Sequence, residues 1–248
     1  QQNLAAKLRS TALSLHSETV DRMLREHLEQ HFTASLRDCF QTVKVLPPPD
    51  EVQVEQDRTT LIIVRPGGQA NQLPISNDWQ AWWGQQQFKN RVLFLSGSRD
   101  TFQKVLDAAR QSRALQSIED DLKAEGTPSD DPQWRNLDAL RDRVALQFSA
   151  SLKEAFDQIV YPSIKSELRA SGIDLAFAGN KNGEETIRKT LEGAQKFTTS
   201  ISDDSFRSKA QGRLFGPADA KTVLWYDFKR NAAVNTSWPL TKPSALED

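Results

Sequence analysis

Two long amphipathic patterns, separated by one short polar break, constrain the fold of this chain more than any other feature. Apolar residues recur at helical spacing over 101–124 and again over 134–160. The break EGTPSDDP at 125–132 combines glycine and proline with turn-forming polar residues, and Tyr161-Pro162 ends or kinks the second helix. We therefore expect a helix-rich fold. The apolar positions are Phe102, Val105, Leu106, Ala109, Leu115, Ile118 and Leu122 in the first helix, and Leu137, Leu140, Val144, Phe148, Leu152, Phe156 and Ile159 in the second.

Three short apolar stretches predict a small sheet beside these helices. EVQVEQ at 51–56 and TTLIIV at 59–64 are typical of two strands joined by a tight connection at Asp57-Arg58, and RVLFLS at 91–96 is a third strand. Before them, helical spacing over 3–45 predicts one or two helices, which PPPD at 47–50 ends. The expected fold class is α/β and helix-rich, with a small sheet flanked by long helices.

From about residue 183 the sequence changes from long amphipathic patterns to short ones. Three short helical patterns follow at 182–197, 203–215 and 222–234, and each opens with Asn, Asp or Thr. With the brief extended piece after them, they are typical of a compact helical module, possibly of winged-helix type. We expect a helix-rich α/β domain over 1–175 and this small module over 183–248. Ser244 and Glu247 have the spacing of a capping box, which predicts a helix cut at its start and a fragment of a longer polypeptide.

Bulk composition removes several function classes. The 32 basic and 33 acidic residues leave a net charge of −1, so overall charge gives no reason to expect nucleic acid or an acidic membrane surface. No stretch approaches the roughly 20 apolar residues of a membrane span, and no charged-then-apolar leader opens the chain. The single cysteine, Cys39, excludes an internal disulfide and fits a reducing compartment. We expect a cytoplasmic protein without a membrane partner.

The stretch NRVLFLSGSRDTFQK at 90–104 has the strand, loop and helix order of a phosphate-binding loop. Such a loop needs several backbone N–H groups at a helix N-terminus and usually a lysine that reaches the phosphates. Here the loop offers one glycine, Gly97, without a following Lys-Ser or Lys-Thr, and neither GxxxxGK[ST] nor GxGxxG occurs in the chain. We interpret it as a strand-to-helix connection capped by Ser98 or Asp100. Arg99 is a candidate for contact with a ligand or with a neighbouring subunit, acting in trans.

The pair of histidines in HLEQH at 27–31 is the candidate metal site. His27 and His31 share a helix face, but the zinc-protease pattern places Glu directly after the first His, where Leu28 stands. The chain has no CxxC pair to complete a site and no GxSxG elbow, so a solvated helix face is the favoured interpretation. We assign no catalytic, cofactor-binding or metal-ligating residue. A metal-dependent hydrolase that uses His27 and His31 is the alternative.

An aromatic cluster precedes the third predicted strand and contains Trp79, Trp82, Trp83 and Phe88. Trp82 and Trp83 are sequence neighbours, so on a helix they cannot both point into one small core. A core or inter-domain anchor is one interpretation, because each ring buries a large area. A partner surface at Trp79, Trp82 and Trp83 is the other, because tryptophan is enriched at interface hot spots.

Basic residues gather between residues 207 and 242, where seven stand against two acidic residues. Aromatic residues are interleaved with them, and this combination suits the phosphates and bases of nucleic acid. The same bias also serves solubility or protein contact. The candidate residues for contact with nucleic acid or a partner are Arg213, Lys221, Trp225, Lys229, Arg230, Trp238 and Lys242.

The strand NRVLFLSGSRD and the following VLDAARQSRALQSIEDDL resemble a stretch of large bacterial AAA+-like predicted ATPases. These are of uncharacterised function and are encoded in phage-defence islands, similar to the phage-growth-limitation and BREX-type P-loop ATPases. The tail from GEETIRKTLEGAQKF to SALED resembles their C-terminal end, so the resemblance covers most of residues 80–248. The positions that match the family pattern are Asn90, Phe94, Leu95, Arg110, Ala114, Leu115 and Ile118.

This resemblance implies a non-catalytic region of a larger ATPase. The nucleotide-binding motif of that family lies upstream of the matched region and has no counterpart in this chain, so ATP and Mg²⁺ are implied only for the parent protein. DNA, other parts of the parent ATPase and other defence-system subunits are the implied partners.

Overall fold

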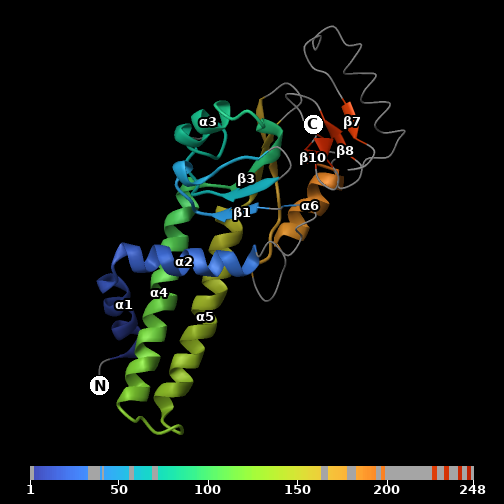
Figure 1. Cartoon of the computed structure of the whole chain (residues 1–248). Coiled ribbons are helices and arrows are strands. Elements are labelled where there is room, and N and C mark those ends of the chain that lie inside the picture. The colour runs from blue at the N-terminus through green and yellow to red at the C-terminus, as the bar shows by residue number, and fades with distance from the viewer. Residues whose placement is uncertain are drawn as a thin grey trace.

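The computed structural model describes residues 3–32, 40, 42–55, 59–68, 72–162, 167–177 and 183–193, together with the backbone of five short strands between 197 and 246 (Figure 1). The helices are α1 (Leu4–Ser14), α2 (Ser17–His31), α3 (Asn77–Gly84), α4 (Arg99–Ala124), α5 (Pro132–Ala155) and α6 (Gly183–Gly193), with 3-10 turns η1 (Pro49–Glu51) and η2 (Lys89–Arg91). The strands are β1 (Thr42–Val45), β2 (Thr60–Ile63), β3 (Val92–Ser96), β4 (Gln158–Pro162), β5 (Leu168–Gly172), β6 (Phe197–Thr198), β7 (Trp225–Asp227), β8 (Ala232–Val234), β9 (Leu240–Thr241) and β10 (Ala245–Leu246).

A five-stranded mixed sheet, in the order β1-β2-β3-β4-β5, forms the centre of the fold. The first three strands are parallel, with Leu61 of β2 opposite Val43 of β1 and Leu93 of β3. β4 pairs antiparallel with β3, and β5 pairs antiparallel with β4. The connection from β2 to β3 runs through α3, and the connection from β3 to β4 runs through both long helices.

Side chains of the sheet alternate between two cores, as the twofold period of a strand requires. Leu61 and Ile63 of β2 face the larger core, which α2, α4 and α5 cover. Ile62 faces the smaller core, which Trp79 and Trp83 of α3 help to close. Burial on both faces explains why β2 and β3 are continuous apolar runs.

Helices α4 and α5 pair antiparallel and extend well beyond the sheet, and α1 lies along their far part (Figure 1). We call this far part, with its own apolar cluster, the helical arm. With 26 residues at about 1.5 Å per residue, α4 spans roughly 39 Å. Gly126 has φ 68 just after α4, and the Asp131 side chain accepts a hydrogen bond from the Gln133 N–H to cap α5 at 2.8 Å. The buried residues of the arm are Leu8, Ala12, Ala114, Leu115, Ile118, Leu122, Leu137 and Val144.

The structure confirms the α/β class, the two long helices and the strands at 59–64 and 91–96, and corrects the rest of the predicted sheet. Residues 52–55 form no strand, although Val52 and Val54 pack against the smaller core, so the alternation at 51–56 reflects burial without ladder pairing. The strand beside β2 is β1, which lies within the stretch predicted as helical. The second long helix ends at Ala155 and not near 160, and residues 158–162 form β4.

Towards the C-terminus, α6 confirms part of the first short helix, while the prediction for 222–234 is wrong. Its described residues form β7 and β8, which pair antiparallel. The helix predicted at 203–215 lies outside the described residues. Ile187 and Leu191 of α6 join the larger core, and the boundary between 175 and 183 stays a prediction. Of the helices that the structure describes, none combines the length and apolar character needed to cross a membrane.

Candidate functional site

The carboxyl ends of β1, β2 and β3 meet at one edge of the sheet, which we call the carboxyl edge. Leu46 follows β1, Val64 follows β2 and Gly97 follows β3. The Leu46 N–H donates to the Ile63 carbonyl at 2.8 Å, and the Val64 N–H donates to the Leu95 carbonyl at 3.0 Å, so the three ends stay in register. Open α/β sheets bind their ligands outside this edge. It is therefore the first place to look for a functional site.

Gly97 allows the chain to pass unusually close to the end of α5. A Cβ atom on this residue would lie 2.1 Å from the Ala155 carbonyl oxygen and 2.8 Å from the Asp157 Oδ1 atom. The preceding Ser96 is buried, and its hydroxyl donates to the Pro74 carbonyl at 2.8 Å. This glycine thus serves backbone packing.

Arg99 begins α4 at the carboxyl edge, and its side chain is exposed to solvent. It makes no ion pair or hydrogen bond with any residue that the structure describes. The predicted cap is only partly correct: Ser98 occupies the N-cap position, but its side chain makes no capping hydrogen bond. The unsatisfied N–H groups of the first turn and the guanidinium contribute positive potential at this end of α4, and the acidic side chain of Asp100 in the same turn opposes it.

Further charged residues lie at this edge: Arg65 is already engaged, whereas the buried Oδ1 atom of Asp157 accepts no hydrogen bond from a described residue. Arg65 follows β2 and pairs with Asp21 of α2 at 2.9 Å, while its guanidinium lies over the Phe102 ring at 5.7 Å. Burial raises the pKa of the Asp157 carboxyl above its ordinary value, and the nearby Glu154 carboxylate adds to the rise. Asp100 also lies in the first turn of α4, so the described part of this edge carries charged groups of both signs beside Arg99.

The His27 and His31 pair packs against the larger core, with His31 buried and His27 half-buried, so the solvated helix face predicted for it is wrong. The His27 ring stacks on Phe148 of α5 with centroids 4.5 Å apart, and the His31 ring meets the edge of Phe177 at 5.3 Å. Burial, with a smaller contribution from His31, lowers the pKa of His27 from 6.5 to about 4. Within the described ranges, no cluster of three or more metal-ligating side chains occurs.

The tryptophan cluster belongs mostly to the smaller core. Trp79 and Trp83 are buried, and the Trp83 indole N–H donates to the Lys89 carbonyl at 3.1 Å. Trp82 is half-buried at the margin of this core, with its ring 5.2 Å from that of Trp79. Of the three tryptophans, Trp82 is the one with an appreciable accessible area for a partner.

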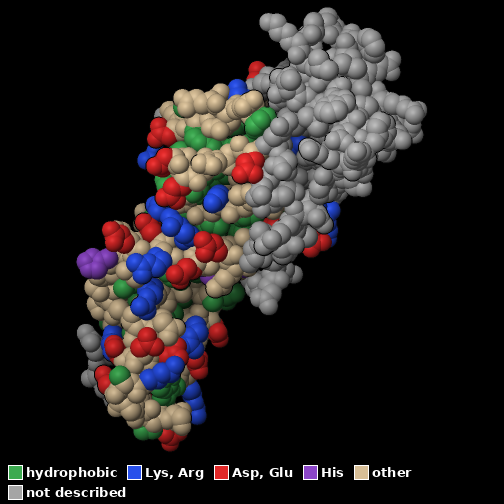
Figure 2. Space-filling view, in the orientation of Figure 1, with side chains coloured by type: hydrophobic (Ala, Val, Ile, Leu, Met, Phe, Trp, Pro, Cys, Tyr) green, Lys and Arg blue, Asp and Glu red, His purple; other side chains and the backbone are tan. Residues whose placement is uncertain are grey.

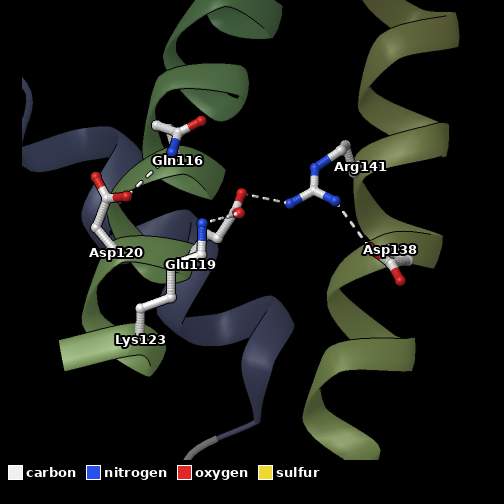
Figure 3. Close-up of polar contacts among 6 residues, drawn as sticks. All are labelled: Gln116, Glu119, Asp120, Lys123, Asp138 and Arg141. Atoms are coloured by element: carbon white, nitrogen blue, oxygen red, sulfur yellow. Dashed lines mark hydrogen bonds and ion pairs between the residues drawn. The ribbon is translucent and has the colours of Figure 1, made fainter. Parts of the chain in front are cut away.

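A chain of ion pairs joins the two long helices of the arm (Figure 3). Glu119 of α4 contacts Arg141 of α5 at 2.6 Å and Lys123 at 2.7 Å, and Arg141 also contacts Asp138 at 2.8 Å. The hydrogen bond from Lys123 lowers the pKa of Glu119, and Arg141 lowers it further. Lysine and arginine side chains alternate with acidic ones over the visible face of the arm (Figure 2). Such exposed pairs fix the arrangement of the helices more than they stabilise it.

The predicted basic contact residues lie beyond what the structure places in detail. Trp225 begins β7, of which only the backbone is described. The others, namely Arg213, Lys221, Lys229, Arg230, Trp238 and Lys242, lie outside the described residues. Their role stays a prediction from the sequence.

Sequence reasoning singled out Arg99 but missed Arg65 and Asp157 at the same edge. Arg65 directly follows a predicted strand, and the rule that parallel strands end at one edge was the available signal. Asp157 was hidden because the helical pattern was extended past it. No protein-family profile, curated protein or solved structure matches this chain.

Proposed function

We propose that this chain is a non-catalytic interaction region of a large phage-defence-associated bacterial ATPase, and that it contacts partner subunits or DNA. The residues that carry the resemblance support a structural role for the strand and helix concerned. Phe94 and Leu95 are buried in β3, and Leu115 and Ile118 are buried in the arm. Arg110 donates to the Leu15 carbonyl at 3.1 Å and so ties α4 to the joint between α1 and α2.

The observation that carries the proposal is an exposed Arg99, which pairs with none of the described residues, at a carboxyl edge without a phosphate-binding loop. An α/β domain that bound its own nucleotide would offer several backbone N–H groups and a lysine there. A lone arginine that faces outward suits the γ-phosphate of a nucleotide held by a neighbouring subunit, because such a cation stabilises the charge of the transition state. We propose this partner role in the cytoplasm, with residues 183–248 as a winged-helix-like module.

In the complete ATPase, Arg99→Ala is expected to lower kcat for ATP hydrolysis by about 10³-fold, since an arginine supplied in trans is worth at least that much. Arg99→Lys should restore only a small part, because lysine lacks the planar fork. Steady-state hydrolysis assays on the assembled enzyme measure this effect. Arg135→Ala is the matched control: Arg135 is also exposed and unpaired among the described residues, but lies near the tip of the arm. A wild-type kcat for ATP hydrolysis in Arg99→Ala would contradict the proposed trans-acting role of Arg99.

DNA contact is the second candidate, and the seven basic residues against two acidic ones between 207 and 242 favour it. We expect the binding of short DNA duplexes to weaken steeply with salt. In a plot of the logarithm of the binding constant against the logarithm of the salt concentration, the slope should become shallower by about two units in Lys229→Glu/Arg230→Glu. Fluorescence anisotropy across a salt series measures both. Arg9→Glu/Arg135→Glu changes net charge by the same amount on the arm and should leave the slope unchanged. Equal losses in the two double variants would mean that overall charge, and not this stretch, attracts DNA.

The alternative of a metal-dependent hydrolase has less support from the geometry. The His27 ring is stacked against Phe148, and the His31 ring packs against Phe177. A hydrolytic metal site needs an open coordination position that substrate or water can reach. The two rings face phenylalanine side chains instead.

A further inference from the structure

A groove of about 350 Å³ lies between α4 and α5 and is bounded by residues of these two helices alone. Ala108 of α4 and Ala150 and Ser151 of α5 line its middle. Small side chains on both helices allow another helix to approach closely. At one end, Lys104 of α4 and Glu154 of α5 face each other at 3.7 Å.

Leu146 stands beside this groove and is 72% exposed. It lies one helical turn before Ala150, so the two residues share a face of α5. The described residues expose only one other large apolar side chain to this degree, Leu13 of α1. Three small residues, Ala108, Ala150 and Ser151, leave room in a groove that is otherwise lined by Lys104, Asp107, Gln111, Gln147 and Glu154. A protruding leucine next to such a groove is the arrangement of a knob beside a hole.

The charges along this face of α5 have opposite signs at its two ends. Arg143, Gln147, Ala150 and Glu154 follow one another at steps of four, three and four residues, so they form one stripe. Arg143 is exposed and makes no ion pair with any described residue, and the Glu154 side chain is 56% exposed, so it can contact a second partner in addition to Lys104. When two such stripes run antiparallel, the basic end of each meets the acidic end of the other.

We propose that this face of the α4–α5 pair is a self-association surface, and that its occupant is a second copy of the same chain. A twofold axis near the level of Phe148 places Leu146 of each copy in the groove of the other, and places Arg143 of each copy against Glu154 of the other. Such a contact is isologous and closes after two copies, as symmetric dimers require. The inference goes beyond the proposed function and depends on neither Arg99 nor the basic residues after 207.

The test is the oligomeric state of the purified 248-residue chain, measured by sedimentation equilibrium over a wide concentration series. We expect a reversible dimer whose dissociation constant rises about tenfold or more in Leu146→Glu, because a charge replaces an apolar anchor. Leu13→Glu makes the same change at the other exposed leucine and should leave the dimer intact.

The ion pair between Arg143 of one copy and Glu154 of the other has its own test, a charge reversal followed by its rescue. Arg143→Glu should weaken the dimer, because two acidic groups then face each other across the axis. Arg143→Glu combined with Glu154→Arg reverses both charges and should restore it. A chain that is monomeric throughout the series, or equal effects of Leu146→Glu and Leu13→Glu, would overturn the proposal. DNA binding and ATP hydrolysis report on the proposed function alone, so the two ideas can fail separately.

Discussion

Replacing Gly97 with alanine is expected to lower the free energy of unfolding by about 3 kcal/mol or more. The new Cβ atom would lie 2.1 Å from the oxygen and 2.6 Å from the carbon of the Ala155 carbonyl. Both are backbone atoms at the end of α5, which leads directly into β4. Relief of the clash therefore has to displace β3 or β4, and these two strands pair in the middle of the sheet.

Urea denaturation followed by circular dichroism measures this change. Gly84→Ala is the matched control, because nothing lies within 4 Å of the position where its Cβ would be. At that site, in the last turn of α3, alanine should be neutral or stabilise by up to about 1 kcal/mol. Equal unfolding midpoints for Gly97→Ala and the wild type would show that the close approach is not rigid.

Acidification from pH 7 to pH 4 is expected to lower stability through His27 by at most about 3 kcal/mol, and by less where solvent screens the half-buried ring. Burial and His31 lower the pKa of His27 from 6.5 to about 4 in the folded chain. Between these two values the unfolded chain binds a proton that the folded chain does not, so stability falls as the pH falls. Well above pH 6.5 both states are neutral at this position, and His27 adds no pH dependence there.

His27→Phe should remove this part of the pH dependence while it keeps an aromatic ring against Phe148. Unfolding free energies of the variant and the wild type, measured at several pH values from 7 to 4, should diverge as the pH falls. Acidic groups titrate in both proteins and cancel in the difference. His16→Gln changes an exposed histidine and should follow the wild type. Parallel curves for His27→Phe and the wild type would contradict the expected effect.

The sequence predicts an element well where many of its residues follow the same helical or strand spacing. The stripe from Phe102 to Leu122 is long enough for the helical period to stand out, and β2 and β3 are apolar runs because the sheet is covered on both faces. β4 was missed because Phe156 and Ile159 continue the helical spacing of α5 past its end at Ala155. Local spacing permits both structures there, and pairing with β3 decides between them.

The surroundings of the candidate residues were harder to predict than the residues themselves. His27 and His31 share a face of α2, as expected, but that face is covered by Phe148 and by Phe177, which are far away in the sequence. The exposure of Arg99 was expected from its loop, whereas the exposure of Leu146 was not. Leu146 falls off the buried stripe that contains Val144 and Phe148, and only the packing of α5 shows that no other described element covers it.

The placement of the arm between β3 and β4 also bears on how the chain folds and varies. Neighbouring antiparallel strands are usually joined by a tight turn, and here two helices of 26 and 24 residues take its place. Because these helices pair along their length, the end of α5 lies close to the start of α4. Contacts between the two helices form step by step and offset the loop-closure entropy that pairing β3 with β4 costs. Insertions or deletions of matched whole turns in both helices then change the reach of the arm but leave the strand register untouched. The length of the arm can therefore change without a change in the sheet.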